Sequence, residues 1–216
     1  MAISSLYKGA ALLGGAGSVA GGYALATHLS SDKKQENKVT SIEDRLRSEG
    51  YTPLDFTNTN GDGWSKIKEA YKLENSEDKR FSGVEKEGNN TLSGIRDSCL
   101  RYLKEESTNE SNYKMSRRWC VVPISVKDKL GAGNLLKSGT NESDDHSKWD
   151  EVVKKNDKDN NKFVTFSESG KSSDDKKTEI KKQCETKAAI ETTKEEFEES
   201  LNQVNLWCTQ AAGTAG

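Results

Sequence analysis

The apolar positions between residues 60 and 210 recur at helical spacing and predict several short helices. Apolar side chains three, four and seven positions apart lie on one face of an α-helix, and that face is buried against neighbouring elements. The sets with this spacing are Trp64, Ile67 and Tyr71; Leu92, Ile95, Cys99, Tyr102 and Leu103; Trp149, Val152 and Val153; Ile180, Cys184, Ala188 and Ala189; and Phe197, Leu201, Val204 and Cys208. The pattern predicts a mainly α fold.

Polar residues at the ends of these sets indicate where the helices begin and end. Thr91 and Ser173 are suitable N-caps, and residues 193–196 read as a capping box, Thr-x-x-Glu. A further short helix is expected over residues 41–50, capped at both ends. A further element contains Tyr113 and Cys120, and Pro123 ends it because proline cannot continue a helix.

The scarce residues of the chain line up twice, at an offset of 85 positions. Trp64 matches Trp149, Phe81 matches Phe166, Ile95 matches Ile180 and Cys99 matches Cys184; after a further shift of three positions, Trp119 and Cys120 match Trp207 and Cys208. This frame predicts a tandem duplication of a three-helix unit whose core is anchored by the matched residues. The regions around Phe81 and Phe163–Phe166 are either short strands or buried loop anchors.

Composition and patterning together divide the chain into six segments. The Gly-rich stretch between the two copies is weakly patterned and indicates a linker. The expected segments are an N-terminal transmembrane anchor or signal segment at 1–30, a linker with a short helix at 31–55, repeat 1 at 56–125, a linker at 126–145, repeat 2 at 146–210 and a disordered tail at 211–216.

Residues 9–27 are apolar or small and contain no charged side chain. At about 1.5 Å per residue, a helix of this length crosses most of a hydrocarbon core about 30 Å thick. A permanent N-terminal anchor is therefore favoured, because the run is as long as a membrane span. The alternative is a cleaved signal peptide with residues 24–26, Ala-Leu-Ala, as its cleavage site. A lipoprotein anchor is excluded because the first cysteine is Cys99.

The N-terminal run also carries a resemblance. Lys8-Gly-Ala-Ala-Leu-Leu-Gly-Gly-Ala-Gly-Ser-Val-Ala-Gly-Gly-Tyr23, followed by a body rich in Lys, Glu, Asn and Ser, resembles the paralogous families of uncharacterised membrane-associated proteins of haemotropic mycoplasmas. The resemblance covers about the first 30 residues, and beyond them it is one of composition. It implies a membrane-associated protein, exposed on the surface of a wall-less bacterium, and it supplies no catalytic residues.

Four cysteines, two in each copy, allow three disulfide connectivities. The duplication favours Cys99–Cys120 and Cys184–Cys208, because duplicated units usually close internally. The alternative is four free thiols in a cytosolic protein. A zinc site is disfavoured because there is no C-x2-C pair.

Composition argues against nucleic-acid binding and against catalysis. Charged residues make up 31% of the chain but leave a net charge of only −2, and Lys and Glu alternate without forming a basic cluster. The two histidines are His28, at the end of the apolar run, and His146, in a polar stretch that reads as a loop. No set of nucleophile, base and orienting group is visible, so we expect neither an enzyme nor a cofactor.

Two stretches resemble calcium loops. Residues 58–69 have oxygen side chains at the ligand positions but Asn58 at the first one, and residues 157–168 have Lys162 where glycine belongs. A calcium- or ligand-responsive binding module is therefore the alternative function.

We expect first a membrane-anchored protein with an extracellular body that serves interaction or antigenic display at a host interface. The expected partners are the membrane, through residues 1–30, and a host surface protein or an antibody. The oligomeric state is left open.

Overall fold

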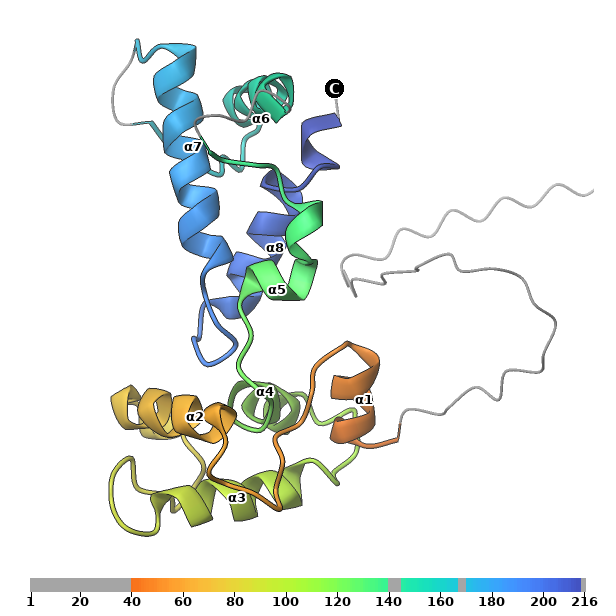
Figure 1. The fold of residues 1–216 in the computed structure, drawn as a ribbon, viewed down its shortest axis with the longest axis vertical. Coiled ribbons are helices and arrows are strands. Elements are labelled where there is room, and N and C mark those ends of the chain that lie inside the picture. Colours follow the sequence, from red (N-terminus) through yellow and green to blue (C-terminus); the bar gives the residue numbers. More distant parts are fainter. Residues whose placement is uncertain (1–39, 140–144, 167–169, 215–216) are drawn as a thin grey trace, which may run out of the picture. The chain divides into compact units, whose positions relative to one another are not determined.

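The computed structural model describes residues 40–139, 145–166 and 170–214, all of which belong to one compact unit, Lys38–Gly216 (Figure 1). The predicted anchor at 1–30 lies outside the described residues. Within them, no helix combines the length and the apolar character that a membrane span requires.

The described chain is mainly α-helical, as the apolar pattern predicts. It contains eight α-helices, with isolated β-bridges and no strand among the described residues. The helices are α1 (Ile42–Ser48), α2 (Asp62–Leu73), α3 (Thr91–Tyr102), α4 (Glu110–Trp119), α5 (Val126–Leu130), α6 (His146–Lys158), α7 (Ser173–Ala188) and α8 (Phe197–Trp207). Short 3-10 helices follow at η1 (Glu77–Lys79), η2 (Ala132–Asn134) and η4 (Ala212–Thr214).

The helices form two groups that occupy the lower and the upper part of Figure 1. In the first half, residues 40–122, α4 packs against α1 and α3. In the second half, residues 123–214, α7 packs against α5, α6 and α8, and α5 also contacts α8. In each half the fourth helix therefore contacts both the third helix and the first.

Helix α1 begins as the sequence predicts for residues 41–50. The Ser41 side chain accepts a hydrogen bond from the Asp44 amide, and the Asp44 carboxylate accepts one from the Ser41 amide in return. Such a capping box satisfies amide groups that the first helical turn leaves without partners. Beyond the other end, Gly50 adopts a φ of 81°, which glycine reaches without the steric cost of a Cβ.

Helix α5 lies where the sequence pattern predicts a linker, over residues 126–145. Ser125 and Asp128 form the same capping box as Ser41 and Asp44. Val126 and Leu130 are buried four positions apart, because α7 and α8 cover that face. A helix of five residues is too short to give a periodic apolar pattern, and a Gly-rich stretch follows it. Three helices lie in residues 56–119 and three in residues 146–210, as predicted, and with α1 and α5 before them each half has four helices.

Two predicted helix starts are displaced by one residue, and one predicted cap does not form. Asn90 rather than Thr91 precedes α3, and Ser172 rather than Ser173 caps α7 by accepting from the Asp175 amide at 3.2 Å. Helix α8 begins only at Phe197, without a side-chain cap. The predicted capping box at 193–196 is wrong because Thr193 is buried in the turn before the helix.

The predicted anchor residues lie in the core with one exception. Each of Trp64, Phe81, Ile95, Trp119, Trp149, Ile180 and Trp207 is at most 2% exposed. Phe166 is only partly buried, and it packs against the edge of this core. Phe81 lies in a loop, so it is a buried loop anchor and not part of a strand. The buried side chains of both halves belong to one continuous hydrophobic cluster.

Three of the buried tryptophans are held by their indole N–H groups. Trp64, Trp119 and Trp149 donate to the backbone carbonyls of Asp55, Lys79 and Lys137 at 2.8, 2.9 and 2.7 Å. A buried indole N–H without an acceptor would destabilise the fold. Each of these hydrogen bonds therefore holds a loop against the indole ring that the loop covers.

Charged side chains join the two halves. We call this contact the junction and define it by the following pairs. They are Lys66 with Glu191 at 2.8 Å, Lys79 with Glu195 at 2.5 Å, the Arg118 Nε with the Thr193 carbonyl at 2.8 Å, Arg117 with Glu198, and Lys129 with the Glu49 carbonyl.

Phe81 and Phe166 provide a matched test of the core. Phe81→Ala should lower the free energy of unfolding by about 3–5 kcal/mol, because a fully buried ring is lost and a cavity remains. Phe166→Ala should cost less than about 2 kcal/mol, since its ring is only partly buried. Urea unfolding followed by tryptophan fluorescence measures both values. Equal losses would contradict the assignment of Phe81 as the deeper anchor.

Candidate binding site beside the second disulfide

The four cysteines form the two disulfides that the duplication predicts. Cys99 on α3 is joined to Cys120 at the end of α4, with a Cα–Cα distance of 5.4 Å, and Cys184 on α7 is joined to Cys208 at the end of α8, at 5.8 Å. No cysteine is free. Each link therefore staples the third helix of one half to the end of its fourth helix.

Backbone contacts around the two disulfides correspond pair by pair. The Leu54 amide donates to the Cys120 carbonyl at 2.9 Å, and the Leu136 amide donates to the Cys208 carbonyl at 2.8 Å. Isolated bridges also match: Ser41 with Glu106 and Ser125 with Glu191; Pro53 with Val121 and Leu135 with Thr209. The extended segment before the second helix of each half is thereby tied to the residues at its disulfide.

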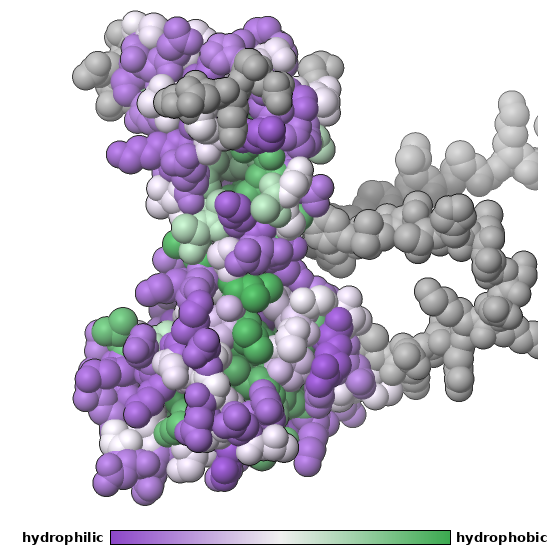
Figure 2. Space-filling model, viewed as in Figure 1, coloured by the Kyte–Doolittle hydropathy of each residue, from purple (hydrophilic) through white to green (hydrophobic). Residues whose placement is uncertain are grey.

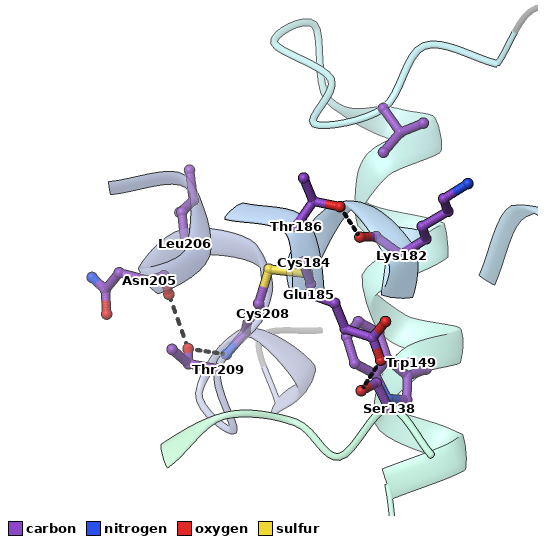
Figure 3. Close-up of a disulfide and its surroundings, with 12 residues drawn as sticks. Ser138, Trp149, Lys182, Cys184, Glu185, Thr186, Asn205, Leu206, Cys208 and Thr209 are labelled. Carbon is purple, nitrogen blue, oxygen red and sulfur yellow. Dashed lines mark hydrogen bonds between the residues drawn. A yellow bond between two sulfur atoms is a disulfide. The ribbon is translucent and has the colours of Figure 1, made fainter. Parts of the chain in front are cut away.

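A hollow of about 670 Å³ lies beside the second disulfide. Its walls come from the segment after α5, from α6 and from the end of α7. The lining residues are Ser125, Lys127, Ala132, Leu135, Leu136, Lys137, Ser138, Gly139, Trp149, Cys184, Glu185, Ala188, Ala189, Glu191 and Cys208. In Figure 3, Ser138, Glu185 and Trp149 lie together on one side of the disulfide.

Comparison with the first half explains why there is room for this hollow. The indole N–H of Trp64 donates to the carbonyl of Asp55. The next residue is Phe56, whose ring packs edge-on against the Trp64 indole with 5.7 Å between the ring centroids. In the second half, the indole N–H of Trp149 donates to the carbonyl of Lys137, and the next residue is Ser138. Four residues beyond the α7 cysteine it has Ala188, where the first half has the buried Leu103. Two smaller side chains therefore stand where the first half has large apolar ones.

The hollow has an apolar floor and a charged rim. Trp149 and Leu136 are almost fully buried, whereas Lys127, Lys137, Glu185 and Glu191 stand around the opening. The Ser138 hydroxyl donates to a Glu185 carboxylate oxygen at 2.5 Å. In Figure 2 the apolar surface, in green, is concentrated in the middle of the view, and hydrophilic residues cover both ends. A concave site of this size with a few polar groups is typical of ligand binding.

Asp145 holds the segment beside the hollow. Its carboxylate accepts from the Lys137 amide at 2.9 Å and from the Gln210 side chain at 3.0 Å, and it pairs with Lys148 at 3.2 Å. The hydrogen bond from the Lys137 backbone is the largest cause that lowers the pKa of Asp145 below its ordinary value. The carboxylate is therefore ionised at neutral pH and ties the loop to the end of the chain.

The predicted loop histidine starts a helix. His146 is the first residue of α6 and is exposed, and its Nε2 lies 3.0 Å from the ammonium of the buried Lys177. Burial lowers the pKa of Lys177, but the hydrogen bond and the charge of Asp150 at 2.6 Å outweigh it and leave that pKa raised. A protonated amine is not a nucleophile, so this cluster is an ion-pair network.

The two calcium-like loops do not form a described metal site. Helix α2 begins at Asp62, so the second half of the 58–69 motif is helical. Glu168, the last ligand position of the 157–168 motif, lies outside the described residues. Among the residues that are described, no group of three or more His, Cys, Asp or Glu side chains could hold a metal ion.

Comparisons with protein-family models, with curated proteins and with solved structures found no match.

The sequence pattern identified the disulfide and Trp149 but not the polar residues at the hollow. Ser138 lies in the predicted linker and Glu185 on the polar side of a predicted helix. The available signal was the difference between the halves: at the offset of 85 positions, the apolar Leu100 and Leu103 correspond to Glu185 and Ala188. The correspondence of Phe56 with Ser138 is visible only in the structure. A loss of apolar side chains in one copy indicates either a new polar surface or a cavity.

Removal of either disulfide should destabilise the body to a similar extent. The bonded cysteines are 21 and 24 residues apart in the sequence. By lowering the entropy of the unfolded chain, each disulfide should stabilise the fold by about 3 kcal/mol. Cys184→Ser with Cys208→Ser, and Cys99→Ser with Cys120→Ser, should each lower the free energy of unfolding by that amount in urea. A loss below about 1 kcal/mol in either pair would contradict a structural role for that link.

The acid stability of the body should depend on Asp145. Because its folded pKa is lowered, its contribution is complete above the unfolded value of about 3.9 and is lost as pH falls through the folded pKa. Asp145→Asn should therefore lower stability at pH 7 by about 1–2 kcal/mol and flatten the fall in stability below pH 4. Thermal unfolding between pH 7 and pH 2.5 measures both effects; parallel curves for the two proteins would contradict the assignment.

Proposed function

We propose that this protein is anchored in a membrane by its N-terminal segment and exposes a duplicated helical body that serves interaction or antigenic display at a host interface. The observation that carries the proposal is the pair of closed disulfides with no cysteine left over. Disulfides of this kind form and persist outside the reducing cytosol. The uncharged run at residues 9–27 supplies the means of attachment, and the resemblance to mycoplasma surface families points the same way.

Tandem duplication belongs to this proposal. It is supported by the matched disulfides, the matched capping boxes of α1 and α5, and the matched bridges around each disulfide. The order of the helices is also the same in the two halves. Duplicated modules that close internally can change their surfaces separately, which suits a protein whose exposed loops meet varying partners.

A second candidate is a ligand-binding module. The hollow of about 670 Å³ beside the second disulfide favours it, since cavities of about 300–1,000 Å³ accept small molecules. This candidate is compatible with a surface location, because a surface module can bind a ligand there.

Protease shaving of intact cells and thiol labelling test the location. In cells that express the full chain, external trypsin should remove the body, whereas a cytosolic marker stays intact. A maleimide should label the denatured chain only after reductant is added, because all four thiols are paired. A Cys184→Ser variant is the control, since denaturation exposes its freed Cys208, which is 2% exposed in the fold, for labelling without reductant.

The opposite results would identify a cytosolic protein. Digestion only after lysis, together with labelling of all four thiols in a denatured lysate without reductant, would refute the proposal.

Cell fractionation distinguishes a permanent anchor from a cleaved signal peptide. An anchored chain stays with the membrane, whereas a chain released into the medium, with a shortened N-terminus, would identify residues 1–30 as a signal peptide.

A further inference from the structure

The junction of the two halves contains a second, smaller hollow of about 260 Å³. Five of its lining side chains are cationic, namely Lys79, Lys114, Arg117, Arg118 and Lys194. Only two are acidic, Asp78 and Glu195. The chain as a whole has a net charge of −2, so this concentration of positive charge contrasts with the rest of the molecule.

Some of these cations are neutralised by carboxylates and some are not. Lys79 pairs with Glu195, and Arg118 pairs with Glu74, each at 2.5 Å. Lys114 and Lys194 are exposed, and neither ammonium has an ion-pair or hydrogen-bond partner in the described chain. The lining therefore contains two lysines outside any ion pair of the described residues, although Lys114 also interacts electrostatically with Glu110.

Arg117 adds a buried donor to the same hollow. The residue is 8% exposed, and its guanidinium is held between the rings of Tyr113 and Phe197, at 5.9 and 5.8 Å from their centroids. It pairs with Glu198 through Nη1, but its Nε is buried and has no hydrogen-bond acceptor. Buried donors normally have partners, so an unsatisfied one in a cationic hollow points to an acceptor supplied from outside.

We propose that this hollow binds a tetrahedral oxyanion, a sulfate or phosphate group. Such a group has several acceptor oxygens and up to two negative charges, which match the ammonium groups of Lys114 and Lys194 and the guanidinium donors. The site draws Lys114 and Arg117 from the first half and Lys194 from the second, so a bound anion would bridge them. The inference stands apart from the surface role, since the hollow is the same wherever the body resides.

Trp119 is a built-in reporter for this site. Its indole N–H donates to the carbonyl of Lys79, and the Arg118 guanidinium lies 4.4 Å from the centre of its ring. Trp149 lies in the second half, where its indole N–H donates to Lys137, outside the lining of this hollow. The two indole N–H resonances therefore separate local binding from a general effect of salt.

Titration of sulfate and of inorganic phosphate into the ¹⁵N-labelled, oxidised full-length chain tests the proposal. Sodium chloride keeps the ionic strength constant, and Trp119→Phe and Trp149→Phe assign the two signals. The Trp119 signal should shift and saturate with a dissociation constant on the order of 1 mM, and phosphate should compete with sulfate. The Trp149 signal should stay within experimental error.

A pair of variants with equal net charge sharpens the result. Lys114→Gln with Lys194→Gln should weaken binding about tenfold, because two charge-assisted contacts are lost. Lys68→Gln with Lys182→Gln removes two exposed lysines away from the hollow and should leave the affinity within about twofold. Equal affinities of the two variants, or linear shifts of all four indoles without saturation, would overturn the proposal.

Discussion

Each half of this protein depends on one covalent link between its third helix and the end of its fourth. Cys120 and Cys208 also accept backbone hydrogen bonds from Leu54 and Leu136, so each link holds a third segment, the one that leads into the second helix. Only 31% of the residues are hydrophobic, and a small apolar core stabilises a fold weakly by itself. The disulfides restrict the unfolded chain and add stability that the core alone would not supply.

The larger hollow lies where the two halves differ in the size of corresponding side chains. In the first half, Phe56 covers the tryptophan of its second helix, whereas the second half has Ser138, which bonds to Glu185. At the junction, cations of the first half meet an acidic stretch of the second, and Lys114 and Lys194 form no ion pair with the described residues. The second half thus has a hollow with an apolar floor and a charged rim where the first half has an aromatic ring over its tryptophan.

The fold could be predicted from the sequence to the extent that it rests on local patterns. Apolar spacing identified the longer helices, and the recurrence of scarce residues identified both cysteine pairs. Helix α5 was not predictable in this way, because Val126 and Leu130 form a single pair and are buried only once α7 and α8 are in place. The hollows depend on partners far apart in sequence, such as Ser138 with Glu185 and Arg117 with Glu198, and local periodicity carries no information about such pairs.

The tryptophans bond to the main chain of the loops that cover them. Trp64, Trp119 and Trp149 donate to the carbonyls of Asp55, Lys79 and Lys137, and every amino acid offers the same carbonyl at those places. The side chains of these three residues can therefore be exchanged without loss of the bond that seats the loop. Substitution of the exposed Asp55 and Lys137 can therefore change the surface of the protein without loss of these indole hydrogen bonds, whereas Lys79 is constrained by its ion pair with Glu195.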